Sequence, residues 1–167
     1  VGDGLIIQIA EPQIVKWLTE QAINAGKDIG KDMSNYKVMV AAPAYTGPTN
    51  KTLEKVKWFP AMVGNHVADI VEKYGKDTDE VPKSLTAYIE KRRGYDYSKH
   101  GQSDNPYLDF ITDDVVESFC VLGEPEAHVE KLKVLENSGA TQFNIYLDNG
   151  DEEKIIADYG EKIIPHF

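Results

Sequence analysis

Apolar residues along this chain form continuous runs that alternate with helical stripes. Three continuous runs have the composition of buried strands, and they are residues 5–10, 36–42 and 142–147. Each run is followed by a segment with apolar residues every three or four positions, as in a helix that packs on a sheet. The pattern predicts parallel strands joined by right-handed helical crossovers.

Proline and glycine residues predict where these elements begin and end. Glu-Pro pairs stand where two helices can start, and Gly residues follow their last apolar positions. The helices predicted on this basis are residues 12–26, 124–138 and 152–164. Pro43, which precedes a turn at 45–48, is expected to end the second strand.

Residues 50–119 interrupt the alternation and are predicted to be an insertion. Residues 52–74 have a helical pattern interrupted by Pro60, residues 81–93 form a second helical pattern, and 94–110 are aromatic and polar without a period. Thr112 then caps a short helix, whose apolar side is Val115, Val116 and Phe119. A loop this long in a compact domain is usually functional, which favours a lid or a binding wall.

Three such strands fit either a doubly wound sheet or a (β/α)8 barrel, and three strands complete neither. The first run, residues 5–10, has the composition of a strand buried on both faces, and such a strand needs neighbours on both sides. We therefore expect further protein to precede residue 1, so that the chain is the C-terminal part of a larger barrel enzyme.

Composition excludes several classes of partner. With 41% hydrophobic residues in 167, the chain can form a core, and it lacks the roughly 18 consecutive apolar residues of a membrane span. A net charge of −10 with one short basic cluster, residues 91–93, argues against nucleic acid. Cys120 is the only cysteine, and no metal-ligand spacing is present, so a reducing cytoplasm is expected.

Four segments resemble a known family in their order and spacing. The segments are residues 3–7, 40–45, 119–129 and 139–147, the last followed by Tyr159-Gly160 and Ile163-Ile164-Pro165. They resemble the luciferase-like flavin and deazaflavin oxidoreductases, and the resemblance is closest to the branch of F420-dependent, methylenetetrahydromethanopterin reductase-like enzymes.

The resemblance implies a (β/α)8 barrel with a large insertion after its seventh strand. The strands here would be the sixth, seventh and eighth, and residues 50–110 would be the insertion in a single partial barrel domain, 1–167. The family's N-terminal strands, with a cis-peptide segment at the cofactor and a phosphate loop after the fifth strand, are absent from this sequence. The implied partners are the missing N-terminal barrel half, a small-molecule substrate and further copies in a homo-oligomer.

Barrel active sites lie at the carboxyl ends of the strands, which selects several candidates by position. These are Gln8, Glu11, Pro43, Tyr45, Asp148 and Asn149. For Glu11 and Asp148, capping of the following helix is favoured over catalysis. The Tyr45 ring could stack on an isoalloxazine-type cofactor or position a substrate, and packing against the insertion is an equal alternative.

The insertion contains further candidates for binding an anionic substrate or an acidic cofactor tail. They are His66, Arg93, Tyr95, Tyr97 and His100, with Arg93 suited to a bidentate contact. A structural, hydrogen-bonded role is favoured for His66, which lies near Val63 and Val67 in a helical pattern. His100 is expected to be exposed.

Three residues around the helix at 124–138 have less direct interpretations. Gly123, before the helix start, could help to bind an anion at free N–H groups, although Glu124 would compete for them. His128 is expected on the surface beside a carboxylate, without a catalytic role. Cys120 is expected to be a buried, unreactive thiol.

The sequence has no Ser-His-Asp order, Walker loop or GxGxxG motif, which fits an enzyme whose cofactor supplies the chemistry. The resemblance implies hydride transfer between the deazaflavin coenzyme F420 and an organic substrate. An FMN-dependent luciferase-like monooxygenase is the alternative enzyme. A non-catalytic fragment or subunit that needs the missing barrel half is the alternative of another class.

Overall fold

A computed structural model describes residues 2–74, 111–147 and 150–167. The strands are β1 (Gly4–Ile7), β2 (Lys37–Thr46), β3 (Val121–Gly123) and β4 (Gln142–Tyr146). The α-helices are α1 (Pro12–Asp28), α2 (Thr49–Val56), α3 (Trp58–Tyr74), α5 (Asp113–Phe119), α6 (Pro125–Asn137) and α7 (Glu152–Asp158). A π-helical turn, η3 (Tyr159–Ile163), and a 3-10 turn, η4 (Ile164–His166), complete the C-terminal segment.

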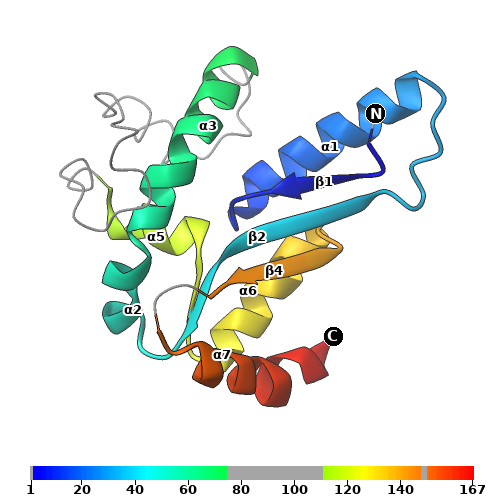
Figure 1. The fold of residues 1–167 in the computed structure, drawn as a ribbon. Coiled ribbons are helices and arrows are strands. Elements are labelled where there is room, and N and C mark those ends of the chain that lie inside the picture. Colours follow the sequence, from blue (N-terminus) through cyan, green and yellow to red (C-terminus); the bar gives the residue numbers. More distant parts are fainter. Residues whose placement is uncertain (1, 75–110, 148–149) are drawn as a thin grey trace.

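The strands form a parallel sheet around β2, as the alternating pattern predicts. β2 pairs with β1 through residues 37–40, with β4 through 39–43 and with β3 through 44–46. Since β1 and β4 pair with overlapping stretches of β2, they lie on opposite edges of it, as Figure 1 shows. The prediction of three strands is wrong by one, because β3 is too short to have a recognisable period.

The second strand is longer than predicted and passes through Pro43 to end at Thr46. Pro43 lies where the pairing of β2 with β4 ends and the pairing with β3 begins. A residue without an N–H group is tolerated at such a change of partner. The prediction that Pro43 ends the strand is therefore wrong.

The first strand is shorter than predicted and is buried on one face only. β1 ends at Ile7, and the N–H of Ala10 donates instead to the carbonyl of Phe119, at 2.9 Å. Ile6, whose side chain points to the other face, is 63% exposed, whereas Ile7 is buried. The expected burial on both faces is therefore absent in the described part of the chain.

The register divides the sheet into a covered face and an open face. On the covered face, Ile7, Val40 and Phe143 are at one level and lie toward the core. On the open face, the side chains of Ile6, Gln142 and Asn144 are exposed to solvent. In the described residues this face is thus uncovered around these side chains, whereas its carboxyl end, at Pro43 and Tyr45, is buried.

Helix α1 follows β1 as predicted and begins where the Glu-Pro pair places it. The Glu11 carboxylate accepts a hydrogen bond from the N–H of Ile14, at 2.7 Å, and Pro12 occupies the first helical position. Ile14, Val15 and Trp17 form the buried side of the helix. Capping and the apolar stripe together explain why this segment is helical.

The helical pattern at residues 52–74 is two helices, α2 and α3, which meet at Lys57. Pro60 does not cause the break, because it lies in the first turn of α3, where its missing N–H group is not needed. Thr112 directly precedes α5, at the predicted capping position, but its side chain makes no capping hydrogen bond. The helix predicted at 81–93 and the aperiodic segment 94–110 lie outside the described residues.

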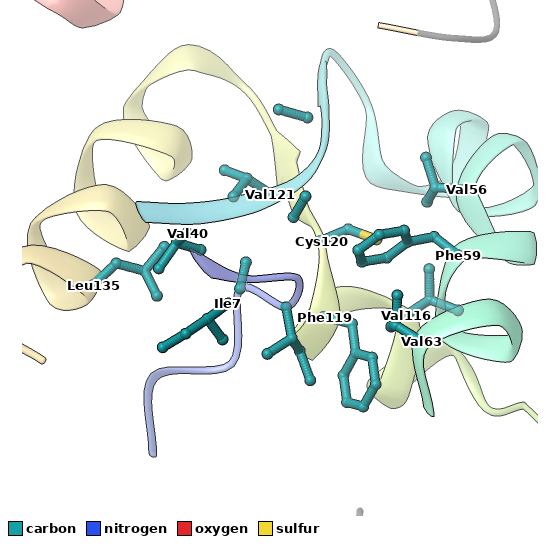
Figure 2. Close-up of a cluster of buried hydrophobic side chains, with 14 of the residues drawn as sticks. Ile7, Val40, Val56, Phe59, Val63, Val116, Phe119, Cys120, Val121 and Leu135 are labelled. Atoms are coloured by element: carbon teal, nitrogen blue, oxygen red, sulfur yellow. The ribbon is translucent and has the colours of Figure 1, made fainter. Parts of the chain in front are cut away.

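The core continues from the covered face of the sheet to the helices that follow β2. Figure 2 shows Ile7, Val40 and Leu135 to one side and Val56, Phe59, Val63 and Val116 to the other, with Phe119, Cys120 and Val121 between them. In Figure 1, α2 lies beside the carboxyl end of β2, and α3 starts near α2 and extends away from that end. None of the helices in the described ranges is long and apolar enough to cross a membrane.

Candidate functional site

The carboxyl ends of β1, β2 and β4 lie at the same edge of the sheet because these strands are parallel. Gln8 follows β1, Tyr45 is the penultimate residue of β2, and Tyr146 is the last residue of β4. Helix α3 brings the aromatic ring of Phe59 to this edge, and helix α2 brings the ammonium group of Lys55. This edge of the sheet is the candidate site.

A hydrogen bond between Gln8 and Tyr146 connects the two strands that flank β2. The Nε2 of Gln8 donates to the phenol oxygen of Tyr146, at 2.7 Å. Phe59, on α3, meets the Tyr146 ring with centroids 5.8 Å apart and ring planes at 64°. Pro43 is the register partner of Tyr146 on β2. The site therefore has an apolar wall beside a polar pair.

Tyr45 is buried, and its ring packs against the helix that follows β2. The ammonium group of Lys55, on α2, lies 5.5 Å from the centroid of the Tyr45 ring, a cation–π arrangement. Lys55 also forms an ion pair with Asp151, which raises the pKa of Lys55 and lowers the pKa of Asp151. Tyr45 is 1% exposed, so its ring is part of the packing under α2.

The predicted carboxylate at the end of β1 has a structural role in this fold. Glu11 is buried and caps α1 through its bond to the N–H of Ile14. Burial raises the pKa of the Glu11 carboxyl, and the backbone N–H groups of Ile14 and Gln13 oppose that shift. This geometry agrees with the preference for capping over catalysis.

A second polar cluster holds the end of β2 on the covered face. The hydroxyl of Thr46 donates to the carboxylate of Asp158, at 2.6 Å, and Lys154 and Lys162 each donate to the same carboxylate, at 2.6 Å. These donors hold the pKa of Asp158 far below its usual range. The cluster fastens the C-terminal segment to the strand that carries Tyr45.

His128 is buried, and the expectation of a surface histidine beside a carboxylate is wrong. Its Nδ1 lies 3.0 Å from the hydroxyl of Tyr159, and its Nε2 lies 3.2 Å from the carbonyl oxygen of Tyr45. Burial lowers the pKa of His128 to about 4, so the ring is neutral near pH 7. The sequence around His128 could not show this burial, since its partners are a distant tyrosine and a backbone carbonyl.

Gly123 occupies a conformation that favours glycine. Its φ is +120°, and a Cβ atom added to it would lie 3.0 Å from the Cβ of Ala127. Its carbonyl accepts from the N–H of Gly47, at 2.9 Å. A turn at the end of β3 explains this glycine, and the suggested anion site stays a prediction.

The thiol of Cys120 is fully buried, and burial raises its pKa, which agrees with the expected unreactive thiol. Beside it, the ammonium group of Lys131 donates to the carbonyls of Glu117, Ser118 and Cys120. These carbonyls belong to the end of α5, where helical partners run out. Lys131 therefore joins α6 to α5.

In the part of the chain that the structure describes, no contact connects the remaining candidates to this edge. His66 is exposed on α3, whereas Val63 and Val67 are buried, so the favoured packed histidine is not observed. Arg93, Tyr95, Tyr97, His100, Asp148 and Asn149 lie outside the described residues. Within the described ranges, no group of His, Cys, Asp and Glu could hold a metal ion.

Two of the residues at the site were not singled out from the sequence. Tyr146 lies next to the end of the strand predicted at 142–147, so the positional rule that selects Gln8 would also have selected it. Phe59 lies in a helical pattern, where an apolar ring has the appearance of a core residue. Its contact with Tyr146 depends on the break between α2 and α3, which the sequence pattern places three residues too late.

A parallel α/β sheet with polar and aromatic side chains at the carboxyl ends of its strands is typical of enzymes with barrel or doubly wound folds. The family model described as luciferase-like monooxygenase matches residues 1–142. The chain belongs to this luciferase-like family, and the resemblance noted from the sequence is confirmed.

Two known proteins are similar to the whole chain. The curated 5,10-methylenetetrahydromethanopterin reductase of Methanopyrus kandleri is 25% identical over 175 residues, covering 100% of this chain and 46% of the relative. The solved coenzyme F420-dependent tetrahydromethanopterin reductase from Methanopyrus kandleri has a TM-score of 0.68 and 22% identity, with the same coverage. The second likeness supports the fold, and the chain spans about half the length of both proteins.

Proposed function

We propose that this chain is the C-terminal part of an F420-dependent oxidoreductase, which transfers a hydride between the deazaflavin and an organic small-molecule substrate. Membership of the luciferase-like family supports an oxidoreductase, and similarity to a methylenetetrahydromethanopterin reductase supports F420 as cofactor. The deazaflavin, when bound, supplies the hydride chemistry. The protein's part is to bind, orient and shield the reactants.

The open face of the sheet is the observation that carries this proposal. Ile6 is 63% exposed on that face, beside the half-buried Met39. In a (β/α)8 barrel this face would point to the interior, where side chains from the other strands cover it. We propose that β1, β2 and β4 are the sixth, seventh and eighth strands, and that an N-terminal barrel half completes the fold.

The residues at the carboxyl edge fit one side of a flat cofactor. The half-buried Tyr146 ring, which the buried Phe59 supports, offers an apolar surface, and the exposed Gln8 supplies polar atoms next to it. Gln8, Pro43, Tyr45 and Gly123 are the proposed cofactor-side residues. Because Tyr45 packs under Lys55, its role would be to shape the floor of the site, rather than to stack on the ring.

Residues 50–119 are proposed to cover this site as an insertion within the single partial domain. Helices α2, α3 and α5 are the described helices of that segment. The proposed substrate-side residues are Glu11, His66, Arg93, Tyr95, His100 and Asp148. Among these, Glu11 is the least suited to substrate contact, because its carboxylate is buried and caps α1.

Two alternatives have support of their own. The matching family model is described as luciferase-like monooxygenase, which favours an FMN-dependent monooxygenase. The 46% coverage of the relative favours a subunit or fragment that is inactive without the other half. A homo-oligomer and a cytoplasmic location stay predictions.

The absorption spectrum and turnover of the native protein test these possibilities. We expect an absorption band of the deazaflavin near the violet edge on binding. This band should bleach when F420 is reduced by a hydride from the substrate. Two flavin absorption bands and oxygen-dependent turnover with FMN would instead identify FMN as the cofactor. Native mass spectrometry tests the assembly, because a sample of this chain alone that binds cofactor would refute the missing half.

A further inference from the structure

The bond between Gln8 and Tyr146 leaves donors and acceptors of the pair unused. Gln8 donates one of its two Nε2 hydrogens to the phenol oxygen, so the phenol O–H is directed elsewhere and the amide Oε1 still has its lone pairs. In the described part of the chain, neither atom has another hydrogen-bond partner. The pair therefore presents a donor beside an acceptor.

This property does not depend on which way the amide of Gln8 is turned. With the amide reversed, the phenol donates to Oε1, which leaves an N–H donor on Gln8 and an acceptor lone pair on Tyr146. Either orientation offers at least one donor beside at least one acceptor. The complement of such a pair is a ligand edge with an adjacent acceptor and donor.

The surroundings favour a flat ring as the carrier of that edge. Phe59 meets the Tyr146 ring at 5.8 Å, and Pro43 is level with Tyr146 on the adjacent strand. Gln8 itself is exposed, and Tyr146 is half-buried on the open face. Phe59 and Pro43 are themselves buried and support the Tyr146 ring, whereas Ile6 is exposed on the same face. A planar heterocycle could lie on this face beside Ile6 and the accessible side of Tyr146 while its polar edge meets the pair.

We propose that Gln8 and Tyr146 together bind the cis-lactam edge of a planar heterocycle, a ring N–H next to a ring C=O. The ring N–H donates to Gln8 while the ring C=O accepts from the phenol of Tyr146. The inference rests on the proposed function for the ligands that carry this edge. These ligands are a deazaflavin or flavin, through its pyrimidine ring, and a pterin substrate, through its lactam. Both residues are positioning residues, with no part in bond making.

The test compares lactam binding by the native protein and by the variants Gln8→Leu and Tyr146→Phe. Gln142→Leu is the matched control, because Gln142 is exposed on the same face at the other end of β4. The probes are F420, FMN and a tetrahydropterin, each with its derivative methylated at the lactam nitrogen. Loss of one hydrogen bond should weaken the sensitive probe about 10-fold in each variant and leave the control unchanged.

The methylated probes separate the pair's role from general packing. The unaltered protein should bind the methylated form of the sensitive probe about 10-fold more weakly, and Gln8→Leu should remove that discrimination. If the substitutions weaken binding of F420 or FMN, the pair binds the lactam of the cofactor. If they weaken binding of the pterin alone, the pair binds the lactam of the substrate.

Two outcomes distinguish this inference from the proposed function. If F420 binds and turns over, while neither variant alters binding of any probe relative to Gln142→Leu, the lactam contact is wrong and the oxidoreductase stands. If F420 does not bind, but FMN or the pterin is weakened in both variants, the lactam contact stands and the cofactor assignment is wrong. Equal binding of all three probes by all four proteins overturns the inference.

Discussion

The buried histidine on α6 should make the fold sensitive to mild acid. His128 is fully buried, with its Nδ1 next to the hydroxyl of Tyr159 and its Nε2 next to the carbonyl of Tyr45. A carbonyl only accepts, so the neutral ring must carry its proton on Nε2 and accept from Tyr159 at Nδ1. Protonation at Nδ1 would make the ring a donor toward Tyr159, so the buried Tyr159 O–H would lose Nδ1 as its acceptor.

The magnitude follows from the lowered pKa of His128. Burial lowers it from 6.5 to about 4, so between these values the unfolded chain binds a proton that the folded chain does not. Stability is therefore complete above pH 6.5 and is lost as the pH falls. At about 1.4 kcal/mol per pH unit, the loss is about 2 kcal/mol at pH 5 and about 3 kcal/mol below pH 4.

Urea unfolding of the native protein and of His128→Gln between pH 7.5 and roughly pH 4.5 measures this term. Glutamine retains polar atoms but does not titrate, so the variant's free energy of unfolding should fall by about 2 kcal/mol less across that range. Glu11 and Asp158 titrate in both proteins, and their effects cancel in the difference. Parallel pH profiles, or an NMR titration of His128 near pH 6.5, would refute the reasoning.

Three further substitutions test other contacts of the fold by urea unfolding. Lys131→Met removes the ammonium group that satisfies three carbonyls at the end of α5, and we expect a loss of about 2 kcal/mol, with Lys133→Met, on the exposed side of α6, unchanged. Gly123→Ala places a Cβ at a φ of +120° and 3.0 Å from Ala127, so it should cost about 1–3 kcal/mol, whereas Gly150→Ala, which has open space around it, should cost less. Asp158→Asn should lower the free energy of unfolding by about 1–2 kcal/mol near pH 7. The low pKa of Asp158 stabilises the fold at pH values above 3.8, the ordinary pKa of the carboxyl, and this contribution disappears as the pH falls. The variant should therefore lose less stability than the native protein below pH 4.

The alternation of strands and helices could be predicted because it depends on local patterns. Apolar runs select the strands, and the Glu-Pro pairs select the starts of α1 and α6, since capping and proline geometry are properties of neighbouring residues. The candidates Gln8 and Pro43 follow from the same logic, because strand ends of a parallel sheet share one edge. To this extent the position of the site is contained in the sequence pattern.

The errors come from contacts between residues far apart in the sequence. β3 is a strand only because residues 44–46 of β2 are there to pair with it. β2 continues through Pro43 because its partner changes at that point. His128 has a surface-like sequence neighbourhood, and its burial results from the approach of Tyr159 and the end of β2. No local pattern contains these partners.

Side chains on the covered face of the sheet bind the end of β2, and they are not part of the open face. The carbonyl of Tyr45 is bonded to His128, and the Thr46 hydroxyl is bonded to Asp158, so the C-terminal segment fixes two successive residues of the strand. Rigid support of this kind keeps a binding surface in register. Weakening either bond should therefore displace the floor of the site while Gln8 and Tyr146 remain bonded to each other. Loss of ligand binding in Asp158→Asn, with the Gln8 and Tyr146 pair intact, would follow from that arrangement.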